Sequence, residues 1–440
     1  MKVTLIEPAM IKTATFGEKP AWMLQPLTLA TLAGLTPPDV EVQAVDDRLE
    51  MIDYDEPRDL VGISVKTFTA QRAYQIADEF RSRGVPVILG GHHPTLLPDE
   101  ALQHADSILV GEAEGIWGNV IQDAQRGQLQ KVYRQPHTLP FENIKVDRSI
   151  FAGKKYLPVG MVETTRGCPF SCNFCSVTTF FGRTFRHRPP AEVVAEIESL
   201  DKKFIFLVDD NIVADKEAAK ALFRALIPLK IRWISQASLT MTKDPELLRL
   251  MHASGCAGVL TGIESISLAN LKQIRKSWNT VGTGYPAALK LARDHGIAIV
   301  GSFILGMDED TQASLDELLD FAIHERLFAA LFNLLTPYPG TELYSQFLEA
   351  GRLTRPAWWL DPDYRYGSPV FTPKNISADQ LEQARLRLYR QFYGPRSMLK
   401  RFLEPSANLQ DLWHAFTFLT MNLPASNEEL MRYGRTLGAS

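Results

Sequence analysis

Short apolar runs alternate with longer amphipathic segments over the first 125 residues of the chain. A helical segment at residues 70–83, for example, places Ala73, Ile76, Ala77 and Phe80 on one face. The apolar runs are β-branched or aliphatic and end at polar residues or glycine, as buried parallel strands do. They are Lys2–Ile6, Val40–Val45, Leu60–Val65, Val85–Leu89 and Ser107–Val110. This alternation predicts an N-terminal doubly wound parallel sheet over residues 1–125.

A second alternation begins after residues 126–156, a predicted linker with one candidate strand, Gln130–Arg134. Helix signals separate its strands: Pro189-Pro190 opens one helix, and Asp244 and Gly255 bound another. The strand candidates are Val159–Thr164, Phe204–Val208, Arg232–Gln236, Gly258–Gly262, Ile297–Ile304 and Leu331–Leu335. Six such units predict a partial (β/α)6 TIM-like barrel over residues 157–345. Amphipathic patterns such as Ala378–Tyr393 predict a helical C-terminal extension over residues 346–440.

Composition excludes several classes of protein. With 45% hydrophobic residues, the 440-residue chain can build more than one core. Its 47 basic and 51 acidic residues give a net charge of −4, so we expect no nucleic-acid partner. The longest apolar run, Trp413–Leu423, is interrupted by His414 and Asn422, so we expect no transmembrane segment and a cytoplasmic location. Lys400-Arg401-Phe402-Leu403 is compatible with peripheral membrane contact, or with a solvated basic face.

Three of the four cysteines lie within eight positions, in Arg166-Gly167-Cys168-Pro169-Phe170-Ser171-Cys172-Asn173-Phe174-Cys175. This C-x3-C-x2-C spacing follows the first predicted barrel strand directly. Three clustered thiolates suit a 4Fe–4S cluster and leave one iron open for an external ligand. A structural zinc site with His187 as fourth ligand is the alternative. Cys256 stands alone and is predicted to be a small buried residue.

Ligands of doubly wound sheets bind at the carboxyl ends of the strands. In the N-terminal sheet these ends carry Ser64-Val65-Lys66-Thr67, Gly90-Gly91-His92-His93 and Gly111-Glu112-Ala113-Glu114. A glycine pair lets a ligand approach the backbone closely, although Gly90-Gly91 is equally compatible with a simple turn.

With these motifs the chain resembles the radical S-adenosylmethionine (SAM) enzymes. The segment Gly90–Ala101 and the Gly111–Glu114 motif are similar to the cobalamin-binding, Rossmann-like domain of one large branch of that family. That branch includes the anaerobic magnesium-protoporphyrin ester cyclase and the hopanoid C-2 methylase. The resemblance covers nearly the whole chain, and the cysteine motif is its most specific part.

The resemblance implies site residues for each cofactor. Cys168, Cys172 and Cys175 are expected to ligate the cluster. SAM is expected to contact Phe174, Asp209, Gln236, Glu264, Gly301 and Gly306. Cobalamin is expected to contact Ser64, Thr67, Gly90, Gly91, His93, Gly111 and Glu112. The pattern D-x-H-x-x-G, which supplies an axial histidine in many cobalamin domains, is absent, which is compatible with cobalamin bound without a histidine ligand or with a domain that has lost cobalamin.

The activity that the resemblance implies starts with reductive cleavage of SAM to a 5′-deoxyadenosyl radical. Cobalamin-dependent methylation of an unactivated carbon on a small-molecule or lipid-like substrate is the leading hypothesis. Radical cyclisation or oxidation without methyl transfer is the second hypothesis. A cobalamin-binding sensor or a zinc-binding structural protein is an alternative of another class. An external electron donor such as flavodoxin or ferredoxin is the expected partner.

Overall fold

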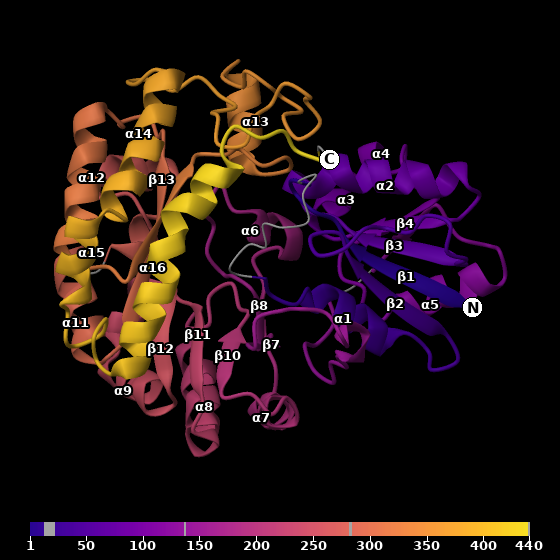
Figure 1. The fold of residues 1–440 in the computed structure, drawn as a ribbon, viewed down its shortest axis with the longest axis horizontal. Coiled ribbons are helices and arrows are strands. Elements are labelled where there is room, and N and C mark those ends of the chain that lie inside the picture. The colour runs from indigo at the N-terminus through magenta and orange to yellow at the C-terminus, as the bar shows by residue number, and fades with distance from the viewer. Residues whose placement is uncertain (13–22, 136–137, 281–283, 439–440) are drawn as a thin grey trace.

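The computed structural model describes residues 1–12, 23–135, 138–280 and 284–438. It contains two α/β units side by side, each built on a six-stranded sheet, with further helices laid over the C-terminal unit (Figure 1). This is the predicted fold class.

The N-terminal sheet is entirely parallel, with strand order β2-β1-β3-β4-β5-β6. Its strands are β1 (Lys2–Glu7), β2 (Glu41–Asp46), β3 (Leu60–Ser64), β4 (Val87–Gly90), β5 (Ser107–Val110) and β6 (Val132–Arg134). Strand β6 lies in the segment predicted as a linker, and it extends this sheet by pairing with β5. All five residues of β3 are buried because helices cover both faces of the sheet.

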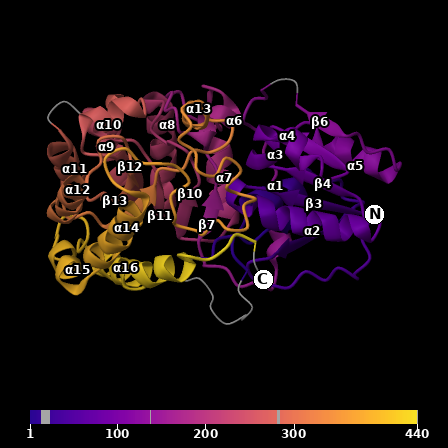
Figure 2. The ribbon, with the colours of Figure 1, turned by 90° about the horizontal axis from the view of Figure 1, so that it is seen from above.

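The helices of the N-terminal unit divide between those two faces (Figure 2). Leu5 packs in one core with α1 (Leu27–Leu35) and α5 (Trp117–Gln125), whereas its neighbour Ile6 packs in the other with α2 (Ala70–Ser82). Two short helices, α3 (His92–Leu96) and α4 (Pro98–Ala101), follow the carboxyl end of β4.

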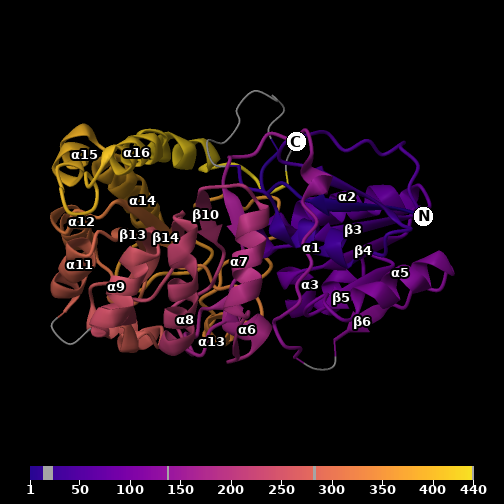
Figure 3. The ribbon, with the colours of Figure 1, turned by 90° about the horizontal axis from the view of Figure 1, so that it is seen from below.

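The second sheet is an open parallel sheet of order β14-β13-β12-β11-β10-β7. Its strands are β7 (Gly160–Val162), β10 (Phe204–Leu207), β11 (Arg232–Gln236), β12 (Cys256–Glu264), β13 (Ala298–Leu305) and β14 (Ala329–Leu334). The outer helices, seen in Figure 3, are α7 (Pro190–Ser199), α8 (Lys216–Leu226), α9 (Pro245–Ala253), α11 (Tyr285–Asp294) and α12 (Gln312–His324). As predicted, Asp244 caps α9 by accepting a hydrogen bond from the Leu247 amide.

The two faces of this sheet differ. On the helix-covered face, Trp233 and Phe303 are fully buried. On the opposite face, which we call the inner wall, Ile234 and Ser302 remain partly exposed. This alternation follows from the period of two along a strand.

A small antiparallel ribbon and a short helix carry the cysteine motif. Strand β8 (Thr165–Gly167) pairs with β9 (Phe185–His187), and α6 (Ser176–Phe181) begins directly after Cys175. Helix α10 (Leu268–Gln273) follows β12, and α13 (Glu342–Glu349) follows the loop after β14.

The C-terminal extension is helical only from Ala378. Its helices are α14 (Ala378–Phe392), α15 (Pro395–Phe402) and α16 (Leu412–Arg432). The predicted helical extension is confirmed from the Ala378–Tyr393 pattern onward, whereas residues 350–377, in the first part of its predicted range, contain no helix. Instead, Trp358 and Trp359 are buried in the core of the N-terminal unit, which holds the two units together through apolar contact.

Candidate active site

The loop that carries the cysteines is held at its start by two neighbouring carboxylates. Asp209 Oδ1 accepts hydrogen bonds of 2.7 Å from the backbone amides of both Thr164 and Thr165, and Oδ2 accepts one of 2.6 Å from the Thr164 hydroxyl. Asp210 accepts from the Gly167 amide at 3.1 Å. The acidic end of β10 therefore sets the position at which the chain leaves β7 and enters the loop.

Further contacts anchor the middle of the loop. The ring of Phe170 stacks on that of Trp278 with centroids 3.5 Å apart. The side-chain amide of Asn173 donates a hydrogen bond to the backbone carbonyl of Gln273 at 3.0 Å. The backbone carbonyl of Asn173 accepts one from the backbone amide of Leu343 at 2.9 Å. The loop is thus fixed from three separate elements, which suits a site whose ligands must keep a constant spacing.

Cys168, Cys172 and Cys175 are free, partly exposed thiols. Burial raises the pKa of Cys172 to about 11, and repulsion from the other two thiols contributes to this shift, so the three groups lie close enough to interact. Metal coordination offsets such a shift, because a metal binds the thiolate form. The donor set and its placement after the first barrel strand fit a 4Fe–4S cluster.

A buried ion pair lies beside the thiols. Lys276 Nζ is 2.6 Å from Glu264 Oε1. Burial favours the neutral amine, but the charges of Glu264, Cys172 and Cys175 outweigh it and hold the pKa of Lys276 above its ordinary value. A cation is therefore held next to the cysteine loop, where negative charge concentrates when a cluster is bound.

The zinc alternative has no geometric support. His187 is exposed and pairs with Thr165 on the β8–β9 ribbon, away from the cysteine loop. Among the residues that the structure describes, no three His, Cys, Asp or Glu side chains converge as ligands of a single ion. A four-iron cluster does not require such convergence, because each thiolate binds a different iron.

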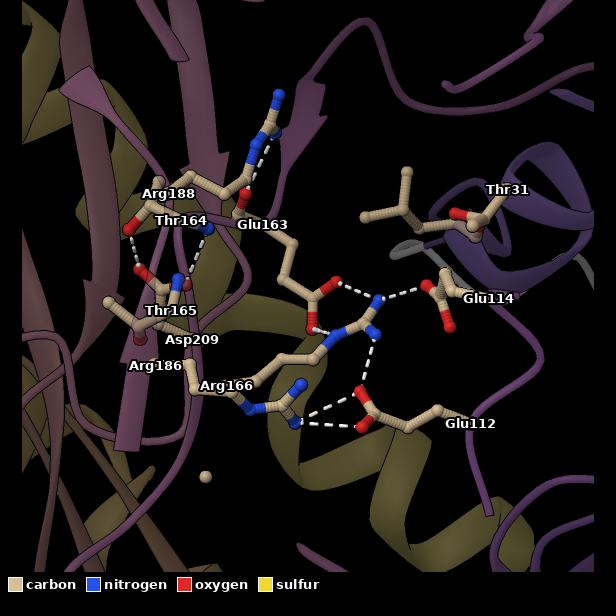
Figure 4. Close-up of polar contacts among 12 residues, drawn as sticks. Thr31, Glu112, Glu114, Glu163, Thr164, Thr165, Arg166, Arg186, Arg188 and Asp209 are labelled. Atoms are coloured by element: carbon tan, nitrogen blue, oxygen red, sulfur yellow. Dashed lines mark hydrogen bonds and ion pairs between the residues drawn. The ribbon is translucent and has the colours of Figure 1, made fainter. Parts of the chain in front are cut away.

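An ion-pair network connects the cysteine loop to the N-terminal unit (Figure 4). Arg166 binds Glu163 through two nitrogens, at 3.0 and 2.9 Å, and lies 2.7 Å from both Glu112 and Glu114. Arg186, opposite Arg166 on the ribbon, pairs with Glu112 at 2.9 Å. Burial opposes these charges, but the carboxylates of Glu163 and Glu114 keep the pKa of Arg166 well above its ordinary value.

The predicted cobalamin residues lie together at one edge of the N-terminal sheet, with one exception. Ser64 and Gly90 are partners in the β3–β4 register. Thr95, which the sequence analysis missed, joins the next two: its hydroxyl donates to the Gly91 carbonyl at 2.8 Å and accepts from the Gly111 amide at 2.9 Å. Gly111 has φ +90°, and a side chain there would enter open space, so the edge leaves room for a ligand.

His93 is the exception. It is fully buried, its Nε2 lies 2.8 Å from Glu100 Oε1, and its Nδ1 lies 3.4 Å from the Thr67 hydroxyl. Tyr74 and Trp359 donate to the same Glu100 carboxylate. Both ring nitrogens therefore face protein groups, and the prediction that His93 contacts a corrin has no support in this geometry.

The predicted SAM residues separate into two groups. Gln236 lies on the inner wall, where its side chain makes no hydrogen bond within the described residues, and Glu264 joins the pair beside the cysteines. Asp209 accepts hydrogen bonds from the backbone amides of Thr164 and Thr165, and Phe174 packs against the barrel core. A side chain at Gly301 would meet Leu327 on the helix-covered face, and Gly306 allows a turn at φ +97°.

His92 also brings the two units into contact and was not predicted. Its ring stacks on Phe180 of α6, with centroids 4.4 Å apart. Burial, aided by Lys66, lowers the pKa of His92 to about 4, so the ring is neutral at pH 7. The only sequence signal for Arg166, His92 and Thr95 is their position inside the motifs.

Comparison with known proteins agrees with this geometry. Residues 162–322 match the model of the radical SAM superfamily, and residues 22–121 match that of the B12 binding domain. Bacteriochlorophyllide d C-8(2)-methyltransferase of Chlorobaculum tepidum is 33% identical over 357 residues, which are 76% of this chain and 78% of that protein. The bacteriochlorophyllide d C-12(1)-methyltransferase of the same organism is 32% identical over 411 residues, which are 90% of this chain and 88% of that protein.

Among solved structures, the radical SAM methyltransferase TsrM from Kitasatospora setae, with cobalamin and a [4Fe-4S] cluster bound, is similar in fold. The TM-score is 0.63 at 20% identity, over 89% of this chain and 85% of that one. With both domain models matched in order and relatives above 30% identity along most of their length, the predicted family is confirmed: the chain belongs to the radical SAM enzymes that carry a B12-binding domain.

Proposed function

We propose that this enzyme is a cobalamin-dependent radical SAM methyltransferase that methylates an unactivated carbon of an apolar small molecule. The observation that carries the proposal is the direct junction of the two cofactor regions. Arg166, two residues before Cys168, binds the Gly111–Glu114 motif of the N-terminal unit. This contact brings the cysteine loop next to Gly90, Gly91 and Gly111 at the carboxyl ends of β4 and β5, which we call the glycine edge, as methyl transfer to a carbon radical requires.

When bound, the cluster would supply the electron that cleaves SAM, and the cobalamin would supply the methyl group. Cys168, Cys172 and Cys175 would hold the cluster. Lys276 would place a positive charge beside it, and Gln236 on the inner wall would orient SAM by hydrogen bonding. Asp209 and Asp210 would act through the loop backbone that they hold, without touching the cofactor.

The inner wall supports an apolar substrate. Its partly exposed side chains are mostly apolar, with a few polar groups among them: Phe206, Ile234, Leu260, Val300, Leu331, Gln236, Ser302 and Asn333. Apolar pockets with a few placed polar groups are typical of small-molecule sites. Because two relatives are named as methyltransferases of bacteriochlorophyllide d, an apolar macrocycle is the first substrate class to test, and a lipid-like molecule the second.

The experiment follows the methyl group. Anaerobically reconstituted enzyme, supplied with cobalamin, a reductant and methyl-labelled SAM, is incubated with bacteriochlorophyllide d or with a lipid extract. We expect labelled product together with 5′-deoxyadenosine. Release of deoxyadenosine together with an unlabelled, oxidised or cyclised product would contradict methylation and support radical cyclisation or oxidation without methyl transfer. An external reductase, such as a flavodoxin or ferredoxin system, should replace the chemical reductant.

A further inference from the structure

Exposed apolar side chains are concentrated in the last two helices. Seven of the thirteen large exposed apolar residues in the described part of the chain lie between positions 399 and 431. Four of them, Leu412, Phe416, Leu419 and Leu423, belong to α16, and Leu412 and Phe416 are 89% and 67% exposed. Scattered exposed leucines are common on protein surfaces, but a contiguous apolar stripe on one helix is not.

These four residues form one face of α16, because their spacing of four, three and four keeps them in line along a helix. The opposite face is the one that packs. Phe418 is fully buried against Phe328, and Asn422, one turn later, donates to the Phe328 carbonyl at 3.0 Å. The apolar stripe therefore points away from the protein. Figure 1 shows α16 crossing in front of the barrel strands on the side opposite the outer helices.

The stripe has no charged side chains. From Leu412 to Asn427 the sequence contains no Asp, Glu, Lys or Arg. Water-facing helices in soluble proteins usually carry charges on their outer face. We find no helix in the described residues that could span a bilayer, so the stripe is not part of a membrane-crossing segment.

Helix α15 continues this surface with positive charge. Leu399 and Leu403 are exposed, and the exposed Arg396 and Lys400 alternate with them on the same side. Within the described residues neither Arg396 nor Lys400 makes an ion pair. Helices α15 and α16 contact each other and lie side by side in Figures 1 and 3.

The acids nearby are already engaged. Glu404 is buried and binds Arg326 at 3.2 Å, and Asp411 binds Arg232 at 2.6 Å. Among the described residues of α15 and of α16 up to Leu423, the free charges thus have one sign. We propose that the outward face of α15 and α16 docks on an anionic lipid bilayer, with the leucines and Phe416 inserted at the interface and Arg396 and Lys400 beside the headgroups.

The charge pattern selects this occupant over a second copy of the chain. A surface with only positive free charges is complementary to anionic lipid and repels an identical surface. Docking would also turn the side of the barrel that α16 crosses toward the bilayer. The proposal does not depend on which reaction the enzyme catalyses.

The test is vesicle co-sedimentation of the full-length, cluster-loaded protein. Vesicles of phosphatidylcholine alone are compared with vesicles of phosphatidylcholine and phosphatidylglycerol. We expect binding to the mixed vesicles that weakens as salt rises. The double variant Phe416→Ser/Leu423→Ser should bind about tenfold or more weakly, because it removes two inserted side chains. Arg396→Glu/Lys400→Glu should abolish the preference for phosphatidylglycerol.

The control variant Met51→Ser/Leu348→Ser removes two exposed apolar side chains elsewhere, 69% and 48% exposed, and should bind as the parent does. Unchanged binding by both test variants would overturn the proposal. A second outcome would also overturn it: light scattering shows that the parent is a dimer and that Phe416→Ser/Leu423→Ser is a monomer, while the parent does not bind vesicles. If the double serine variant fails to fold, the charge-reversal variant decides, because the two side chains that it changes are exposed and make no ion pair within the described residues.

Discussion

Arg166 Nη1 donates to Glu112 Oε1 over 2.7 Å and so joins the cysteine loop to the glycine edge of the N-terminal sheet. Arg166 lies two positions before Cys168, a predicted cluster ligand, and Glu112 follows Gly111, where a side chain would enter open space. The same guanidinium is shared by Glu114 and Glu163. One side chain therefore links two motifs that lie more than fifty residues apart in the chain.

Removing this guanidinium should destabilise the contact between the two units. Arg166→Met leaves three carboxylates without their common partner, and breaking a mostly buried pair costs about 3–5 kcal/mol. We expect a lower melting temperature and faster amide exchange in residues 111–114. Arg166→Lys should restore only part of the loss, since lysine cannot bind Glu163 through two nitrogens.

Arg275→Met is the matched control for Arg166. Arg275 also pairs with a glutamate, Glu342, but both side chains are nearly half exposed. Exposed pairs contribute about 0–1 kcal/mol, so this variant should melt close to the parent. Equal losses in the two variants would show that Arg166 has no special role at the junction.

Replacing any one of Cys168, Cys172 and Cys175 by serine should abolish cluster binding. The reconstituted variants should lose the iron–sulfur absorption and the release of 5′-deoxyadenosine, because a cluster with two protein thiolates is not retained. Cys256→Ala is the control: Cys256 is buried at the start of β12, with its thiol near the Gly258 carbonyl. Iron content and electron paramagnetic resonance of the reduced protein measure the outcome.

Lys276→Met should make the cluster harder to reduce. The buried ammonium stabilises the extra negative charge of the reduced form, so its loss should shift the midpoint potential to more negative values. Glu264→Gln should have the opposite effect, because it removes the carboxylate that pairs with the same ammonium. The measurement is a redox titration followed by electron paramagnetic resonance. Lys272→Met, at an exposed position on α10, should leave the potential unchanged.

Asp209 should make stability depend on pH. Burial raises the pKa of Asp209 from 3.8 to about 7, although hydrogen bonds from Thr164 and Thr165 partly oppose the shift. The folded protein therefore retains a proton that the unfolded chain loses. The contribution of this group to stability is complete below about pH 4, falls as pH rises to about 7, and is constant above it.

The comparison with Asp209→Asn isolates this contribution, since asparagine does not titrate. The melting temperature of the parent relative to the variant should fall between pH 4.5 and 7 in protein without cofactors. A difference in melting temperature that does not change with pH would contradict the raised pKa of Asp209. A constant offset added to a pH-dependent difference would report the hydrogen bonds that asparagine loses.

Local pattern was enough to predict most of the elements and to single out the cysteine loop; that its three thiols bind metal stays a prediction. The strand Lys2–Ile6, the helix capped by Asp244 and the loop of Cys168 are encoded by residues close together in the chain, through periodicity, capping and ligand spacing. The order of the two units also followed from this local information, because each unit is built from consecutive β/α elements.

Other assignments depended on which way a side chain faces after packing. The resemblance implied a cobalamin contact for His93 and a SAM contact for Gly301. Packing turns His93 toward Glu100 and sets Gly301 against Leu327, and the SAM contact of Gly301 stays a prediction. A one-residue change of register moves a side chain to the other face of a sheet, and sequence spacing alone does not determine that register.

The sequence by itself determined the alternation of strands and helices in each unit and the grouping of three cysteines in one loop, because these rest on neighbours in the chain. Only the tertiary structure decided that Glu112 pairs with Arg166, that Trp359 is buried in the core of the N-terminal unit, and that the apolar face of α16 points outward. The physical reason is that each of these contacts joins segments far apart in sequence. Such pairings arise from the packing of whole elements and have no local signature.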